Sequence, residues 1–246
     1  MLASADRHYA QTRALAERAA REARKGDVAR VVIRHQAAAA LTTTAAVSAM
    51  LVEQGAPVEP SASLIPLAFT ASPAAVTDMA ARVEHDWQLD RMVMSLVADA
   101  ARAAESVTIT TRPRVGYVRY LSPPSCSRCA ILAGRFYRWS EGFQRHPGCD
   151  CTHLPTTDPR SEFIQNPYDL ADKGLVTGLS KADRQALADG ADLNQLVNVR
   201  SKKAGLTEGG RVLSRAGRPT PAGIYRAAGD DRDKALSLLA RHGYIR

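Results

Sequence analysis

The first hundred residues combine charged positions with Ala, Leu and Val at helical spacing, and three helices are predicted there. The segment 4–25 distributes Arg and Glu around Ala and Leu, and a second helix over 28–54 has Asp27 as its N-cap. A third helix is expected over 73–106, with Ser72 as its N-cap. The N-terminal part is therefore predicted to consist of long antiparallel helices.

Residues with β-branched side chains follow the third helix and predict a small sheet. The runs 107–111 and 116–121 are expected to pair as a short hairpin that leads into Cys126. The run 136–139 is a candidate third strand. The segment 152–168 holds prolines and little periodicity, so it is predicted to be an extended arm.

Helical patterns return in the last third of the chain. Ser180, Asp192, Thr220 and Asp230 each precede a short periodic stretch and are predicted to start helices. Between the second and the third of them, residues 200–219 are rich in Gly and Arg and are expected to be loose.

These patterns predict a mainly α fold, because alanine is abundant and aromatic residues make up only 5% of the 246 residues. Three regions are expected. Residues 1–106 form a helical N-terminal domain, residues 107–168 a small α+β lobe with an extended arm, and residues 169–246 a basic helical C-terminal region.

The net charge of +8 is concentrated near the C-terminus, where residues 200–246 hold 11 Lys and Arg against 4 Asp and Glu. Such a region suggests an anionic partner, either nucleic acid or an acidic protein surface, and a basic face that is only solvated is the alternative of equal weight. The candidate nucleic-acid contacts are the basic residues of the loose stretch, namely Arg200, Lys202, Lys203, Arg211, Arg215 and Arg218.

The N-terminus lacks the apolar core of a signal peptide, and no apolar run reaches the roughly 18 residues of a membrane span. No membrane partner is therefore expected. The chain is expected to be synthesised in a reducing compartment. Clustered cysteines in such a compartment bind metal more often than they form disulfides.

All four cysteines lie in one short stretch together with a histidine, and this cluster predicts a structural zinc site. The five candidate ligands for four positions are Cys126, Cys129, His146, Cys149 and Cys151. His153 is a weaker sixth candidate. A packed thiol cluster or a pair of disulfides is the alternative. A catalytic zinc is not expected, because no Glu stands at H-x-E or HExxH spacing to act as a base.

The string Cys126-x-x-Cys129-x-x-x-x-Gly134-x-x-Tyr137, followed by His146-Pro147-x-Cys149-x-Cys151, resembles the MuF-like minor head protein domain of tailed bacteriophages. A pattern of the type C-x-x-C-x-x-L-x-G…H-P-x-C-R-C recurs in that family, and this chain has Asp150 in place of the usual Arg. Two further strings, within 188–198 and 219–245, are similar to segments of minor capsid proteins from phages of actinobacteria.

The resemblance implies a structural virion protein rather than an enzyme. Such proteins are minor components of the phage head, associated with the portal vertex and with head assembly and DNA packaging or ejection. The implied partners are the portal protein, the major capsid protein and the packaged DNA, with several copies around a symmetric vertex. The implied location is the inside of the head, after assembly in the host cytoplasm.

Two other function classes fit the cysteine pattern less well. An HNH-type nuclease needs Asp-His and Asn-x-x-x-His partners that the stretch lacks. A zinc-ribbon nucleic-acid-binding regulator would concentrate Lys and Arg beside the cysteines, which this chain does not do.

Two sets of C-terminal residues are candidates for binding a protein partner. Three amides within one short helix would be costly if buried without hydrogen bonds, so they form a buried network, contact a partner or face water. These amides are Asn194, Gln195 and Asn198. The second set is apolar and would be buried if the tail docked on the portal, and it comprises Ile224, Tyr225, Leu238 and Leu239.

Overall fold

The computed structural model describes residues 2–56, 66–112, 114–141, 151–158, 165–199 and 218–245. The fold is mainly helical, with 63% helix and a small antiparallel sheet, which confirms the predicted class. The chain divides into two compact units. The first comprises Met1–Ser122 and Ala133–Gln165, and the second comprises Pro123–Leu132 and Asn166–Arg246.

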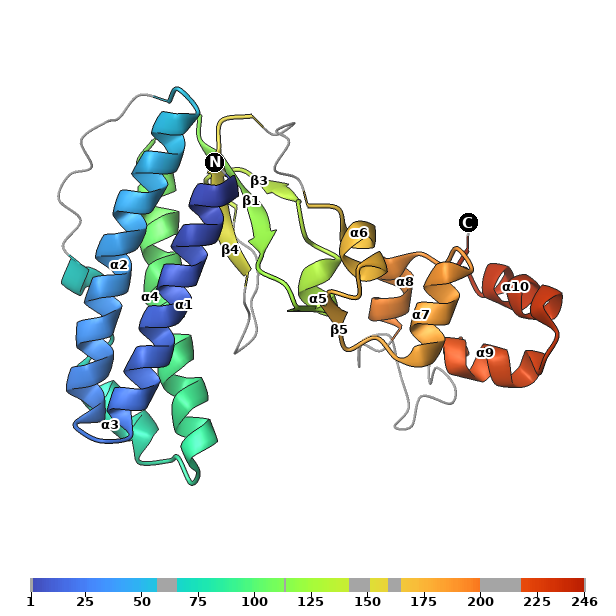
Figure 1. Cartoon of the computed structure of the whole chain (residues 1–246), viewed down its shortest axis with the longest axis horizontal. Coiled ribbons are helices and arrows are strands. Elements are labelled where there is room, and N and C mark those ends of the chain that lie inside the picture. Colours follow the sequence, from blue (N-terminus) through green and yellow to red (C-terminus); the bar gives the residue numbers. More distant parts are fainter. Residues whose placement is uncertain are drawn as a thin grey trace. The chain divides into compact units, whose positions relative to one another are not determined.

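Three long helices dominate the first unit: α1 (Leu2–Ala23), α2 (Val28–Glu53) and α4 (Asp86–Thr110). They lie side by side in Figure 1, with the short η1 (Pro66–Phe69) and α3 (Pro73–Ala80) beside them. Their shared core is built largely from alanine and valine. Small side chains at helix contacts let the axes approach closely, which explains how a chain so poor in aromatic residues still packs.

The predicted helix starts at Asp27 and Ser72 are confirmed, since each side chain accepts a hydrogen bond from a backbone N–H in the first turn that follows. The single helix expected over 73–106 is instead two helices, α3 and α4. The second begins after His85, whose backbone N–H donates to the side chain of Gln88 at 3.0 Å. This local cap starts a new helix where hydrophobic periodicity alone suggested a continuous one.

The sheet of the first unit has the order β3-β1-β4, with all pairs antiparallel. Its strands are β1 (Gly116–Leu121), β3 (Phe136–Tyr137) and β4 (Cys151–Thr156). The third strand expected at 136–139 is therefore confirmed over two residues. All six residues of β1 are buried, and Arg119 on β1 lies opposite His153 on β4.

The predicted hairpin between 107–111 and 116–121 is wrong. Val107–Thr110 form the last turn of α4, where Thr108 and Thr110 donate their hydroxyls to the carbonyls of Ala104 and Ser106. These bonds to the preceding turn let threonine remain in a helix. β1 instead pairs with β3 and with β4, and β4 occupies part of the segment predicted to be an extended arm.

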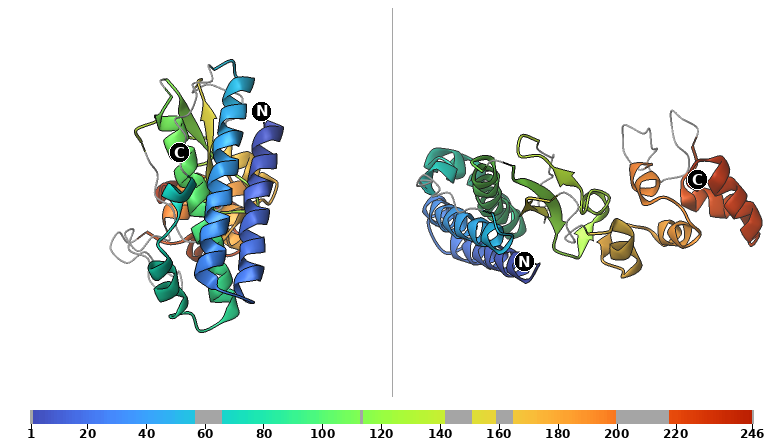
Figure 2. Two further views of the ribbon diagram at one scale, coloured as in Figure 1. Left: turned by 90° about the vertical axis from the view of Figure 1, so that its left-hand side faces the viewer. Right: turned by 90° about the horizontal axis from the view of Figure 1, so that it is seen from above.

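The sheet and the long helices share one core in which Val118, Tyr120 and Leu154 pack with Met50 and Leu51 of α2. Figure 2 shows the three long helices nearly end-on in its right panel, with the strands beside them. The helices and the sheet thus belong to one unit, which differs from the domain boundary predicted after residue 106.

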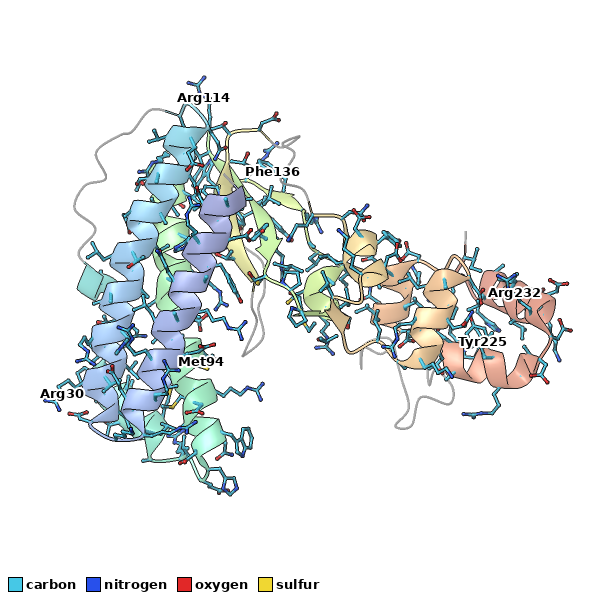
Figure 3. All side chains as sticks on the ribbon, in the orientation of Figure 1. Arg30, Met94, Arg114, Phe136, Tyr225 and Arg232 are labelled. Carbon is cyan, nitrogen blue, oxygen red and sulfur yellow. The ribbon has the colours of Figure 1, made fainter. Side chains whose placement is uncertain are left out.

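Replacing Gly116 by alanine is expected to destabilise the first unit by about 1–3 kcal/mol. A Cβ at this position would lie 2.7 Å from the backbone oxygen of Tyr137 and would also meet the ring of Phe136, which Figure 3 labels. The matched control is Gly26→Ala, where the nearest atom would be 3.8 Å away. Urea unfolding followed by tryptophan fluorescence measures both, and equal effects would contradict this account.

The second unit is built from short elements. They are β2 (Ser125–Cys126), α5 (Ser127–Ala130), α6 (Pro167–Asp172), β5 (Val176–Thr177), α7 (Lys181–Ala188), α8 (Leu193–Asn198), α9 (Pro221–Ala228) and α10 (Arg232–Arg241). β2 and β5 pair in parallel. The predicted N-caps at Ser180, Asp192 and Thr220 are confirmed, and the last helix is capped by Asp231 rather than Asp230.

A compact apolar core joins α7, α8, α9 and α10, which we call the C-terminal helical cluster. Its central side chains, Leu196, Ile224, Leu239 and Tyr244, are almost fully buried. The Tyr244 hydroxyl donates to the carbonyl of Pro219 at 2.8 Å, so the end of the chain is held against the start of α9. Among the described residues, no helix combines the length and apolarity that crossing a lipid bilayer requires.

Candidate functional site

The described members of the cysteine cluster belong to two different units. Cys126 ends β2 and Cys129 lies in α5, both in the second unit, whereas Cys151 opens β4 in the first. Cys129 and Cys151 are buried and Cys126 is half-buried. His146 and Cys149 lie outside the described residues.

The predicted zinc site is contradicted by the structure. Within the described ranges, no group of three or more His, Cys, Asp or Glu side chains is placed to hold a metal ion. The spacing of the thiols along the chain suggested convergence, but their backbone positions are set by separate strands and a helix. The sixth candidate ligand, His153, is directed toward a carboxylate instead.

That carboxylate belongs to Glu105 on α4. The Glu105 side chain is 1% exposed, so it is a buried ionisable group in the first unit. The backbone N–H of His153 donates to its Oε2 at 3.1 Å, and the Nδ1 of the same residue lies 3.0 Å from that oxygen. The hydroxyl of Thr152 donates to Oε1. The Nε2 of His8, on α1, lies 3.4 Å from Oε1. We call these four residues the Glu105 cluster.

Burial alone would raise the pKa of Glu105, but the hydrogen bonds from His153 and His8 and their charges outweigh it and lower the pKa well below its usual value. The carboxylate is therefore ionised. It accepts bonds from α1 and β4 while it belongs to α4, so it joins three elements that are distant in sequence. These buried polar contacts hold α1, α4 and β4 together.

Aromatic and guanidinium groups surround the Glu105 cluster. The ring of Tyr117 meets that of His153 edge-on with centroids 4.5 Å apart, and it stacks on Tyr137 at 5.4 Å. The Nε of Arg102 donates to the carbonyl of Cys151 at 2.9 Å. Arg102 thus joins α4 to β4, whereas Tyr117 joins β1 to its two neighbouring strands.

Sequence reasoning missed the Glu105 cluster, although one signal was present. Glu105 continues the apolar spacing of Val97 and Ala101 along α4, so a carboxylate occupies a position on the buried face. A charge at such a position requires partners. Its partners, at positions 8, 152 and 153, could not be identified without the fold.

A second ionic centre lies in the C-terminal helical cluster around Asp189, just after α7. Its carboxylate accepts hydrogen bonds from the Tyr225 hydroxyl at 2.7 Å and from Arg232 Nη2 at 3.0 Å. Figure 3 shows Tyr225 and Arg232 close to each other on α9 and α10. Burial opposes ionisation, but hydrogen bonds from Tyr225 and Arg232 lower the pKa of Asp189, so the charged form connects three helices.

Replacing Asp189 by alanine is expected to destabilise the C-terminal helical cluster by about 1–3 kcal/mol, because the Tyr225 hydroxyl loses its acceptor. The matched control is Asp230→Ala, an exposed acidic position in the α9–α10 turn. Hydrogen exchange in peptides from α7 and α9 measures the loss. The stability that Asp189 contributes also depends on pH. It is complete above the ordinary carboxyl pKa of 3.8, and it is lost as the pH falls through the lower pKa of the folded state. Unchanged exchange rates would contradict the role of Asp189.

The candidate partner residues fall into two groups. Ile224 and Leu239 are buried in the core of the C-terminal helical cluster, which accounts for them without a partner, and Leu238 is half-buried beside it. Tyr225 donates to Asp189. Asn194 and Asn198 are exposed and stay candidates for a protein contact.

Of the six candidate nucleic-acid contacts, only Arg218 lies within the described residues. Arg218 lies over the ring of Tyr244, 4.0 Å from its centroid, and donates to Gln195 Oε1 at 2.7 Å. Both residues therefore have a structural contact in the C-terminal helical cluster. The remaining candidates, Arg200, Lys202, Lys203, Arg211 and Arg215, lie outside the described residues.

Comparisons of the chain with protein-family models, with curated proteins and with solved structures give no match.

Proposed function

We propose that this chain is a structural minor head protein of a tailed phage, associated with the portal vertex and acting in head assembly and in DNA packaging or ejection. The proposal rests on the resemblance to MuF-like minor head proteins. The observation that carries it is that the described residues of the resembling strings occupy core and turn positions in both folded units.

In the first unit, the string supplies residues that the local fold needs. Gly134 has a φ of 71°, a backbone conformation that favours glycine. Tyr137 stacks on Tyr117, and Cys151 is buried at the start of β4. A pattern that describes packing positions can be retained by a lobe that holds no metal, so the proposal includes no zinc.

In the second unit, the C-terminal strings coincide with the C-terminal helical cluster. Ile224, Leu239 and Tyr244 supply its buried side chains, and Asp189 supplies its ionic centre. Two independent stretches of the resemblance thus correspond to two independent cores. The resembling strings thus contain residues that the fold of this chain depends on, which supports the proposed role.

The proposed partners are the portal protein and the major capsid protein, with several copies around a symmetric vertex. The basic stretch beginning at Arg200 is proposed to contact packaged DNA or an acidic portal face. A DNA contact weakens steeply with salt, with a log–log slope of about 0.9 per phosphate neutralised, whereas a docked protein surface tolerates salt better.

The test is mass spectrometry of purified virions of the phage that encodes the chain, with its copy number counted against the portal protein. The proposal expects the chain in mature heads or proheads, and co-purification with co-expressed portal protein. Absence from both kinds of particle, together with no binding to portal, would refute it. Cleavage of plasmid DNA by the purified chain would point to an enzyme instead.

A further inference from the structure

The C-x-x-C motif places two thiols within one helical turn of the second unit. Cys126 is the N-cap of α5, and Cys129 is the third residue of that helix. Because the Cα of an N-cap residue still lies on the helix cylinder, the two Cα atoms are about 5 Å apart. Disulfides join residues whose Cα atoms are about 4.4–6.8 Å apart. The backbone spacing of the two residues is therefore compatible with a disulfide.

Two short paired strands frame this turn. β2 ends at Cys126 and leads directly into α5, and β5 pairs in parallel with β2 so that Thr177 lies opposite Cys126. The Ser125 N–H also donates to the carbonyl of Leu175 at 3.0 Å. α5 packs against both strands, and β5 lies beside it in Figure 1. A C-x-x-C turn that follows a strand and opens a helix, next to a parallel strand, is typical of a dithiol–disulfide exchange motif.

The two thiols of the motif differ in their access to solvent. Cys126 is half-buried, and Pro124 and Arg128 on either side of it are exposed. Cys129 is 0% exposed. A small reagent in solution therefore reaches Cys126 first, whereas Cys129 reacts with a sulfur that is already held beside it. This difference separates an attacking thiol from a resolving thiol.

We propose that Cys126 and Cys129 form a reversible redox pair that exchanges with low-molecular-weight disulfides. The Cys126 thiolate attacks one sulfur of the small disulfide, forms a mixed disulfide and releases one small thiolate. The Cys129 thiolate then attacks the Cys126 sulfur, closes the disulfide between the two residues and releases the second small thiolate. The protons of the two protein thiols pass through solvent to the two released thiolates. Two protein thiols are thereby oxidised, and the small disulfide is reduced to two thiols.

The short loop that this disulfide closes favours reversibility. The stabilisation that a disulfide gives grows with the length of the closed loop, and this loop is as short as a single turn. The bond is therefore expected to form and break without unfolding the second unit. Cys151 is fully buried at the start of β4 in the first unit, so it is not expected to take part. The inference rests on the second unit alone and does not depend on the proposed phage role.

The test equilibrates the full chain with mixtures of oxidised and reduced glutathione and blocks the remaining thiols with N-ethylmaleimide. Disulfides are then identified by mass spectrometry after tryptic digestion. Trypsin cleaves after Arg128, so the two thiols fall in separate peptides, 120–128 and 129–135, and the other two cysteines fall in the peptide 146–160. The expected product is the first two peptides joined by one disulfide, in a fraction that rises with oxidised glutathione and returns to zero with dithiothreitol.

Two results with the wild-type chain would overturn the proposal. One is that the peptides 120–128 and 129–135 are never linked at any glutathione ratio. The other is that the disulfide joins either of them to the peptide 146–160 instead.

Serine variants test the order of attack. Cys129→Ser lacks the resolving thiol, so it is expected to retain glutathione as a mixed disulfide on the peptide 120–128. Cys126→Ser is expected to take up at least about tenfold less glutathione on the peptide 129–135, because the remaining thiol is buried. Equal uptake by the two variants contradicts the assigned order. Cys129→Ala is a second trapping variant, and it adds no hydroxyl to the buried position.

The matched control is Cys151→Ser, which removes a buried thiol from the first unit. It is expected to link the peptides 120–128 and 129–135 to the same extent as wild type. Loss of the link in this variant would show that Cys151 takes part and would overturn the assigned pair. Circular dichroism checks that all variants keep their helix content.

Discussion

Replacing Glu105 by alanine is expected to lower the free energy of unfolding of the first unit by about 3–5 kcal/mol. The substitution removes the acceptor of Thr152 and His153 and the ion-pair partner of His8, and it leaves their polar groups buried. Both tryptophans of the chain, Trp87 and Trp139, belong to the first unit, so urea unfolding followed by their fluorescence reports on that unit.

Two comparisons separate the Glu105 cluster from a general packing effect. Glu105→Gln keeps the shape and one acceptor, so its loss is expected to be smaller than that of the alanine variant. The wild-type contribution is complete above the ordinary carboxyl pKa of 4.5 and is lost as the pH falls through the lower folded pKa. If the alanine variant were as stable as wild type near neutral pH, the Glu105 cluster would not stabilise the first unit.

Replacing Leu239 by alanine is expected to destabilise the C-terminal helical cluster by about 2–5 kcal/mol. Leu239 is fully buried between α10 and the other helices, so the shortened side chain leaves a cavity that the short helices cannot fill. Hydrogen exchange measured on peptides from α9 and α10 reports the loss of protection directly.

The neighbouring Leu238→Ala is the matched control, because the same atoms are removed from a half-buried position. It is expected to cost clearly less than Leu239→Ala. The pair also distinguishes the two interpretations of the tail. If Leu239→Ala left exchange unchanged and weakened only portal binding, Leu239 would be a partner contact rather than a core residue.

The end of α4 shows where prediction from the sequence failed. The residues Val107–Thr110 favour a strand by composition, yet they complete α4. An established helix extends at little cost, and Ile109 gains burial against the sheet when it does. The local strand propensity of this segment is therefore overridden by packing with Val118 and Leu154 in the same core. These residues are distant in sequence, so the local pattern does not predict the packing.

The cysteine cluster shows the same limit for the site. The spacing of Cys126, Cys129 and Cys151 predicted convergence on a zinc ion, and the described residues contradict it. Spacing along a chain measures proximity only when the intervening segment is a simple loop. Here Cys126 and Cys129 fold with the second unit while Cys151 folds with the first.

The sequence by itself determined the helical class, the caps at Asp27, Ser72, Ser180, Asp192 and Thr220, and the strand at 116–121. These depend on side chains that act within one turn of the chain. Only the tertiary structure decided that β4 pairs with β1, and that Glu105 receives His8 and His153. Those contacts join residues that are far apart in sequence, and their free energy appears only when packing has already brought them together.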